Sequence, residues 1–322
     1  MPDTPDERIH PRLHINSYGA YLRRRFGCRI SKVNVDAGFT CPNRDGSKGV
    51  GGCIYCNNVS FSPKETQAVV PLEEQMAAGM AYHRTRLGSD KFIIYFQKYT
   101  NTYGSVELLS DLYNRALNHP DVIGISVGTR PDSLGDEALD LLTDIARTKY
   151  VCLELGLQSM DDAILNRINR GHTLDDFIGT VNRAAGRNID ICAHLIHGFP
   201  GESRARFLKT AGLLAGLPID SLKLHQLHAV EGTELAELYR RGEFTPLTLE
   251  AYVSAVADFL ELLPPRITIQ RLYGSAPLGI CVAPRWGLKN NQMWYAIVNE
   301  LTRRGSWQGC RTADEGGQSV PG

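Results

Sequence analysis

Residues 38–56, GFTCPNRDGSKGVGGCIYC, place three cysteines, Cys41, Cys53 and Cys56, within one short glycine-rich loop. Cys53 and Cys56 are three positions apart, so a single tight turn can point both sulfurs at one centre. Glycine permits the strained backbone that a loop needs to bend around a bulky group. Cysteine thiolates are ligands for zinc and for iron–sulfur clusters. The loop therefore predicts a metal or cluster site, and three ligands leave one coordination position open for chemistry.

Two other interpretations of the cysteine loop remain open. A lone C-x-x-C motif is also compatible with a zinc site or a thiol–disulfide pair. Zinc would need a fourth ligand, but the next histidine, His83, lies in a helical pattern without a ligand partner. A redox pair usually opens a helix after a strand, whereas here a third cysteine precedes the motif. Cys152 and Cys192 lie in apolar runs and are predicted to be small buried side chains.

The composition of the 322-residue chain is that of an ordinary globular protein with no net charge. Lys and Arg number 35, as do Asp and Glu, so no overall field indicates a nucleic-acid partner. Residues 8–32 are locally basic and include Arg23, Arg24 and Arg25. This segment could contact RNA, but a solvated helix face is the favoured interpretation.

Neither a secretory leader nor a membrane span is predicted. Residues 1–30 are polar, and no apolar run approaches the ~20 residues that cross a bilayer. Eight irregularly spaced cysteines do not form a disulfide framework. We therefore expect a cytoplasmic protein without a membrane partner.

Strand-like and helix-like patterns alternate after the cysteine loop, which predicts a parallel sheet covered by helices on its faces. Six strand–helix units fit between residues 32 and 240, either as an open doubly wound sheet or as a partial barrel. Helix starts with capping boxes are expected at Ser159-x-x-Asp162 and Thr173-x-x-Asp176. The expected strands are 32–35, 91–97, 121–128, 150–159, 188–198 and 221–227.

The alternation of strand and helix patterns ends at residue 229, where a C-terminal extension is expected. Its pattern predicts helices over 247–263 and 289–304 and a strand over 266–272. The predicted organisation is a basic segment over 1–30, the sheet or barrel over 31–228, the extension over 229–310 and a disordered tail over 311–322.

Functional residues in such folds gather at the carboxyl ends of the strands. The cysteine loop follows the first strand, and polar or glycine residues follow the others. Lys223 and His225 alternate along the sixth strand, so they share a face and are candidates for the substrate site. Arg130 could pair with a carboxylate of a ligand or form an internal salt bridge. Asp132 and Ser133 are expected to cap the next helix.

These motifs resemble those of the radical S-adenosylmethionine (SAM) superfamily, in particular its YhcC-like bacterial subfamily, related to the radical domain of the elongator catalytic subunit. The resemblance extends from about Tyr18 to about Trp307. The first cysteine spacing is eleven residues, where the superfamily usually has three. The motifs that carry the resemblance are GFTCPNRDG, GGCIYCN, YFQKYTNTY, GTRPD, LELGLQS, RINRGH, HLIHGFPGE, LKLHQLHAVEGTEL and RLYGSAP.

The resemblance implies an α/β fold, a partial (β/α)6 barrel with a C-terminal α/β extension. It implies that Cys41, Cys53 and Cys56 bind a [4Fe–4S] cluster and that SAM occupies the fourth iron and is cleaved reductively to a 5′-deoxyadenosyl radical. An electron donor such as flavodoxin or ferredoxin would then be a partner. The expected cofactor-binding residues are Gln97, Arg130, Gln158, Ser159, Gly198, Pro200 and Gly201, and the catalytic candidates are Arg130, Lys223 and His225.

The resemblance leaves the substrate open between tRNA and a small molecule or protein. The alternative class is a non-catalytic iron–sulfur or zinc protein that binds or senses without turnover.

Overall fold

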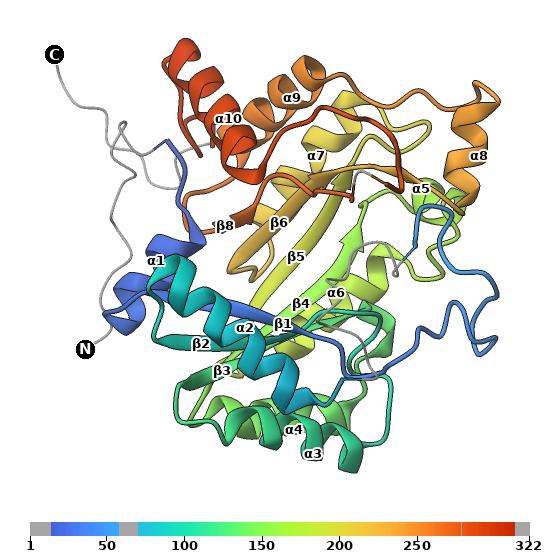
Figure 1. The fold of residues 1–322 in the computed structure, drawn as a ribbon. Coiled ribbons are helices and arrows are strands. Elements are labelled where there is room, and N and C mark those ends of the chain that lie inside the picture. Colours follow the sequence, from blue (N-terminus) through green and yellow to red (C-terminus); the bar gives the residue numbers. More distant parts are fainter. Residues whose placement is uncertain (1–13, 58–69, 278, 313–322) are drawn as a thin grey trace, which may run out of the picture.

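The computed structural model describes residues 14–57, 70–277 and 279–312. Seven parallel strands form one sheet in the order β1-β2-β3-β4-β5-β6-β8, and the sheet curls into a half-barrel (Figure 1). This confirms the predicted partial barrel. The strands are β1 Ile30–Val35, β2 Lys91–Phe96, β3 Val122–Thr129, β4 Tyr150–Gln158, β5 Asp190–His197, β6 Ser221–Gln226 and β8 Thr268–Arg271.

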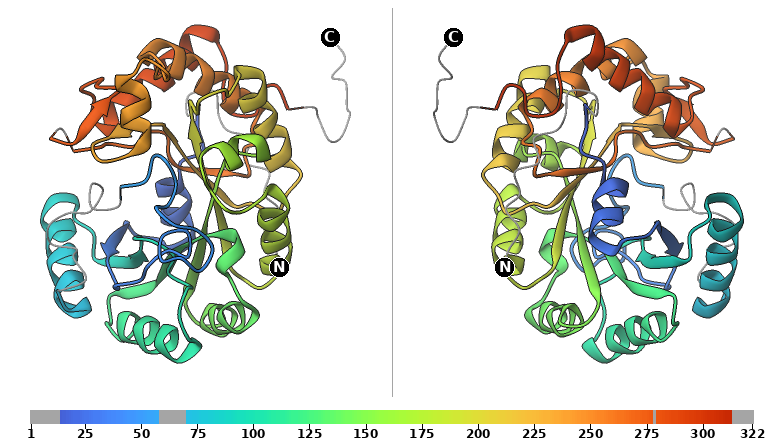
Figure 2. Two further views of the ribbon diagram at one scale, coloured as in Figure 1. Left: turned by 90° about the vertical axis from the view of Figure 1, so that its right-hand side faces the viewer. Right: turned by 90° about the vertical axis from the view of Figure 1, so that its left-hand side faces the viewer.

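The strands are continuous apolar runs because both faces of the sheet are covered. In β2, for example, Phe92, Ile93, Ile94 and Phe96 are fully buried. The helices are α1 Tyr18–Phe26, α2 Leu72–Leu87, α3 Val106–Leu117, α4 Asp136–Ala146, α5 Asp162–Arg167, α6 Leu174–Ala184, α7 Arg204–Ala215, α8 Glu234–Arg240, α9 Leu249–Leu262 and α10 Asn290–Arg304. Most helices lie around the outside of the curved sheet, whereas α1 packs against its concave side (Figure 2).

The strand expected within the C-terminal extension, β8, belongs to the main sheet. It pairs in parallel with β6, and the Thr268 amide donates to Asp220 O at 2.9 Å. Two short strands of the extension, β7 Ala229–Val230 and β9 Cys281–Ala283, form a separate antiparallel pair. The extension therefore contributes directly to the barrel wall.

The first helix, α1, joins the two edge strands of the half-barrel. Ser17 caps the helix and forms a parallel bridge with Ile269 in β8, and α1 also contacts β1. Arg25, in its last turn, donates to Asp190 at the start of β5 at 2.9 Å and lies over the Tyr150 ring. One arginine of the basic segment, Arg25, is therefore paired within the protein. Residues 8–13 of the segment, with Arg8 and Arg12, lie outside the described residues.

Two expected helix caps differ from the structure, and one is confirmed. Thr173 and Asp176 form the predicted capping box. Asp161, and not Ser159, caps α5, because the Ser159 hydroxyl accepts from the Asp161 amide instead. Asp132 does not cap α4, which follows Gly135. Residues 131–133 form a short 3-10 helix in which the Asp132 carboxylate is held by a neighbouring arginine.

Over the described part of the chain, no helix combines the length and apolar character that a bilayer crossing requires. Residues 313–322 of the predicted tail lie outside the described residues.

Gly124→Ala should destabilise the sheet. A Cβ at this position in β3 would lie 2.0 Å from the Tyr150 carbonyl oxygen in β4, so the two strands would have to separate. We expect the free energy of unfolding, measured by urea denaturation, to fall by about 1–3 kcal/mol.

The matched control for this substitution is Gly179→Ala. Gly179 is an exposed residue inside α6 with no atom within 4 Å of the added methyl group. The control should raise stability by up to ~1 kcal/mol, because alanine favours helix over glycine. Equal effects of the two substitutions would contradict the close approach of β3 and β4.

Candidate active site

A cavity of about 340 Å³ opens on the concave side of the half-barrel, where the loops after the strands meet. The cysteine loop, Gln97 after β2, and Gly128 and Arg130 around the end of β3 form part of its wall. The rest is formed by residues of β2, β4, β5, β6 and β8, by Tyr99, Thr100 and Arg170, and by residues that follow β6 and β8. Of the residues expected from the sequence, the cavity brings together Cys41, Cys53, Cys56, Gln97, Arg130, Gln158, Lys223 and His225.

The cysteine loop has the tight turn that the sequence predicts. The Cys56 amide donates to Cys53 O at 2.9 Å. The loop is tied to the segment after α5, because Asn43 Nδ2 donates to Asn169 O at 2.6 Å and the Ile54 amide donates to Ile168 O at 3.1 Å. The three sulfurs are thus held on one side of the cavity by contacts far apart in sequence.

The surroundings of the cysteines fit a cluster better than a single tetrahedral ion. Sulfur ligands of one zinc ion lie about 3.8 Å apart, as Zn–S bonds of about 2.3 Å require. Among the described residues, the ligand atoms that form a set of three within 4.8 Å belong to Glu154, Cys192 and His194, and not to the loop cysteines. At least one pair of the loop sulfurs is therefore more than 4.8 Å apart, which suits a group with several metal atoms.

Two side chains already point hydrogen-bond donors at the sulfur of Cys53. Asn43 Nδ2 lies 3.7 Å from Cys53 Sγ, and Arg170 Nη1 lies 3.8 Å from it. Hydrogen bonds and a positive charge at a thiolate stabilise its anionic form and tune the potential of a cluster that it binds. Sequence reasoning missed both residues, because only the fold brings Arg170 to the loop.

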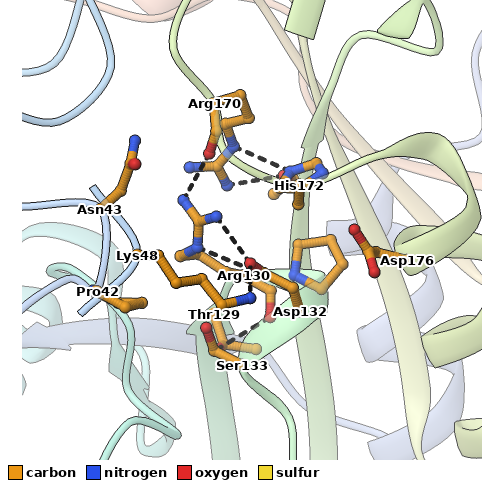
Figure 3. A network of polar contacts seen from close by, with 12 residues as sticks. Pro42, Asn43, Lys48, Thr129, Arg130, Asp132, Ser133, Arg170, His172 and Asp176 are labelled. Carbon is orange, nitrogen blue, oxygen red and sulfur yellow. Dashed lines mark hydrogen bonds and ion pairs between the residues drawn. The ribbon is translucent and has the colours of Figure 1, made fainter. Parts of the chain in front are cut away.

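Arg130 and Arg170 belong to one network of polar contacts (Figure 3). Arg130 Nε and Nη2 each donate to the Asp132 carboxylate at 2.9 Å, and Nη1 donates to Arg170 O at 2.8 Å. Burial alone would raise the pKa of Asp132, but the cations of Arg130 and Lys48 hold it below its usual value. Arg130 therefore forms the internal salt bridge that the sequence left open, and its charge is largely neutralised.

Glu154 lies at the floor of the cavity as a fully buried carboxylate. It accepts hydrogen bonds from Lys32 and Lys223, from His194 at 2.6 Å and from Ser126 at 2.7 Å. Burial would raise its pKa, yet the two ammonium groups hold it well below the usual value. Because both lysines occupy this carboxylate, we do not assign a metal to Glu154, Cys192 and His194. A lone acidic residue within a buried strand requires partners, and this signal could have identified Glu154 from the sequence.

The histidines of the cavity are neutral at pH 7. Burial lowers the pKa of His194 and of His228 to about 4 and that of His225 to about 3. The neighbouring cations Lys223 and Arg271 add to the effect at His194 and His225 respectively. The permanent charges of the cavity therefore belong to its arginines, its lysine and Glu154.

Two polar atoms in the cavity wall lack a hydrogen-bond partner among the described residues. Gln158 Oε1 and Thr100 Oγ1 are both buried and unpaired. Gln158 has a φ of 70°, and Tyr99, which also lines the cavity, has a φ of 61°; both values are uncommon for residues other than glycine. Buried unpaired atoms and strained backbone are typical of positions that contact a ligand. Sequence reasoning identified Gln158 and missed Thr100.

Four expected cofactor residues do not line this cavity. The Ser159 hydroxyl is engaged by the amide of Asp161. Gly198, Pro200 and Gly201 line a second cavity of about 400 Å³ between the end of β5 and the residues before α9.

Known proteins with a cysteine loop above a curled parallel sheet include the radical SAM proteins, and the chain matches their family description directly. The description "Radical SAM superfamily" matches residues 41–214, and "Radical_SAM C-terminal domain" matches residues 219–303. The chain therefore belongs to the radical SAM superfamily, whose members use an iron–sulfur cluster and SAM.

Relatives place the chain in the YhcC-like group. It is 34% identical to YtqA of Bacillus subtilis over 95% of this chain and 94% of that protein, and 38% identical to YhcC of Escherichia coli over 84% and 87%. It is also 29% identical to a tRNA uridine(34) acetyltransferase of Dehalococcoides mccartyi, over 48% of this chain and 34% of that protein. The structure of Elp3 from Methanocaldococcus infernus has the same fold, with a TM-score of 0.64 and 19% identity over 87% of this chain and 64% of that one.

The neutral histidines predict that the protein loses stability as the pH falls from 7 to 5. Histidine in the unfolded chain binds a proton near pH 6.5, whereas His194, His225 and His228 stay neutral in the folded protein to about pH 4 or below. The unfolded state therefore takes up more protons, and each histidine should contribute a slope of up to about 1.4 kcal/mol per pH unit.

Urea denaturation at several pH values measures this slope. His225→Asn should make it shallower, since one of the contributing groups is removed. An unchanged slope in this variant would contradict the buried neutral state of His225.

Proposed function

We propose that the chain is a radical SAM enzyme whose [4Fe–4S] cluster is bound by Cys41, Cys53 and Cys56. The observation that carries the proposal is the position of all three cysteines on one wall of a cavity, with donors from Asn43 and Arg170 at the sulfur of Cys53. When bound, such a cluster supplies an electron that cleaves SAM to a 5′-deoxyadenosyl radical. The protein's own residues hold these groups, exclude water and orient the substrate.

The unpaired atoms of the cavity suggest which residues hold SAM. Gln158 Oε1 can accept a hydrogen bond from a polar ligand, and the Thr100 hydroxyl can accept or donate one. Gln97 also lines this cavity. We propose a positioning role for Arg130, because its guanidinium is already paired with Asp132. Ser159 is bound to the backbone, so we do not keep it as a SAM contact.

The other three residues expected to bind the cofactor line the second cavity and would have to contact it from there: Gly198, Pro200 and Gly201. Gly198 has a φ of 107° and Gly201 a φ of 83°, which only glycine adopts readily, so these residues shape the chain between the two cavities.

The substrate is tRNA or a small molecule or protein, and an electron donor such as flavodoxin or ferredoxin would supply the reductant. The tRNA proposal draws on the name of one relative and on the arginines of α1. The alternative of a non-catalytic iron–sulfur or zinc protein accounts less well for a cavity with unpaired polar atoms, because a sensor without turnover needs no substrate space.

The cysteine assignment predicts that Cys41→Ala, Cys53→Ala and Cys56→Ala each abolish the cluster. The anaerobically reconstituted parent should hold about four iron atoms per chain, as a [4Fe–4S] centre does. With dithionite and SAM it should release 5′-deoxyadenosine even without substrate, and the variants should not. Iron analysis and chromatography of the nucleoside measure both quantities.

The matched control is Cys310→Ala, which removes a partly buried cysteine that does not line the cavity. It should keep full iron content and nucleoside release. Full iron content in Cys41→Ala would overturn the ligand assignment. A fully loaded parent that never releases 5′-deoxyadenosine would instead support the non-catalytic alternative.

The tRNA hypothesis predicts that Arg23 and Arg24 contact phosphates, because both are exposed at the end of α1 whereas Arg25 is paired with Asp190. In a plot of the logarithm of the tRNA binding constant against that of the salt concentration, each of Arg23→Gln and Arg24→Gln should make the slope shallower by about 1. Fluorescence anisotropy with labelled tRNA measures the slope.

Arg303→Gln, on the exposed side of α10, serves as the control and should leave the slope unchanged. Arg25→Gln should lower stability through loss of its pair. Parent protein that shows no salt-dependent tRNA binding at low ionic strength would leave a small molecule or protein as the substrate.

A further inference from the structure

Arg271 is a cationic side chain of the cavity that has no partner in the described part of the chain. It is the last residue of β8, is only partly exposed and lines the cavity. It forms neither a hydrogen bond nor an ion pair through its guanidinium with any described side chain or carbonyl group. A guanidinium carries five donors in a planar fork, so a partly buried one without an acceptor is costly.

Two of the other arginines of the cavity wall have acceptors for their guanidinium groups. Arg130 is paired with Asp132, and Arg170 donates to Cys53 Sγ and to Gly156 O. Arg44 packs against Gly52 within the cysteine loop and, like Arg271, forms no hydrogen bond or ion pair through its guanidinium with a described residue. Arg44 belongs to the cysteine loop, whereas Arg271 lies at the end of β8 beside Lys223.

At that side the charges do not cancel. Glu154 is the one carboxylate among the described residues of the wall, and it is shared by Lys32 and Lys223. Arg271 adds a further positive charge beside Lys223, its Cα partner across β6 and β8. The floor of the cavity therefore has excess positive charge around a single carboxylate, where partial burial strengthens its interaction with an anion.

The Arg271 side of the cavity is also well defined in shape. Gly274 passes so close to His225 that a Cβ there would lie 3.1 Å from the imidazole Cγ. Gln226 Nε2 donates to Gly274 O at 2.9 Å, and the Gly274 amide donates back to Gln226 Oε1 at 3.2 Å. The turn after Arg271 is thus fixed against β6, and neutral His225 offers a hydrogen-bonding ring next to the guanidinium.

We propose that this floor binds an anionic group, a carboxylate or a phosphate, of the substrate, with the Arg271 guanidinium as its main contact. Both groups present the pair of oxygens that a guanidinium fork recognises. The inference rests on the proposed function in taking this cavity as the substrate site. It restricts the substrate to an anionic molecule and gives Arg271 a role in specificity.

Calorimetric titration of the cluster-loaded, SAM-saturated protein tests the proposal, with inorganic phosphate and succinate as probes in a low-chloride buffer. The parent should bind one equivalent of at least one probe. Arg271→Gln should weaken that binding about tenfold or more, as expected for loss of a charge-assisted contact. Arg271→Lys should fall between the two, because it keeps the charge but loses the fork.

Arg86→Gln is the matched control, since Arg86 is exposed on α2 outside the barrel, and it should bind the probe like the parent. Binding of phosphate alone would identify a phosphoryl group, and binding of succinate alone a carboxylate. Probe binding that is equal in Arg271→Gln and the parent, or absent from the parent, would overturn the proposal.

Two further readouts separate the anion site from the radical chemistry. Arg271→Gln should keep its iron content, its SAM affinity and its release of 5′-deoxyadenosine without substrate. A loss of SAM affinity would place the guanidinium on the cofactor and overturn the substrate assignment. A parent that binds the anion through Arg271 but never releases 5′-deoxyadenosine would count against the radical function and leave the anion site supported.

Discussion

The buried carboxylate of Glu154 is the interaction on which the barrel interior depends. Its four donors come from four other strands: Lys32 from β1, Ser126 from β3, His194 from β5 and Lys223 from β6. Buried charges are costly unless they are paired, so each group is stable only while the others are in place. The network thus fixes the curvature of the sheet, and through it the positions of the loops that carry the cysteines.

The same network gives the cavity two ends of different character. The cysteine end offers thiols with donors at Cys53 and the unpaired atoms of Gln158 and Thr100. The floor offers ammonium and guanidinium groups around one carboxylate. A site with fixed dipoles and charges does not need to reorganise when a ligand enters, and such preorganisation is a large part of enzymatic rate enhancement. This division suits a cofactor at one end and a charged substrate at the other.

The sequence was sufficient for the six strands and for the shared loop of the three cysteines, because apolar periodicity and cysteine spacing are local signals. The choice of a partial barrel over an open sheet came from the resemblance to the radical SAM superfamily. It was insufficient wherever a partner came from far along the chain. Asp132 was expected at a helix cap but lies in an ion pair with Arg130, and Ser159 was expected to cap a helix that begins after Asp161. Arg170 reaches Cys53 across 117 residues, and no local pattern encodes that contact.

The seam between the two edge strands is closed by segments that are almost a whole chain apart. Asn16 accepts from the Ile269 amide and its own amide donates to Gln308, and His14 contacts Ser306 across 292 residues. Contacts between residues so far apart in sequence form late in folding, because the chain must first lose the entropy of closing a long loop. During synthesis the cysteine loop is made early, yet the wall opposite it arrives with β8. The three cysteines are therefore synthesised well before the strand that completes the wall of the cavity around them.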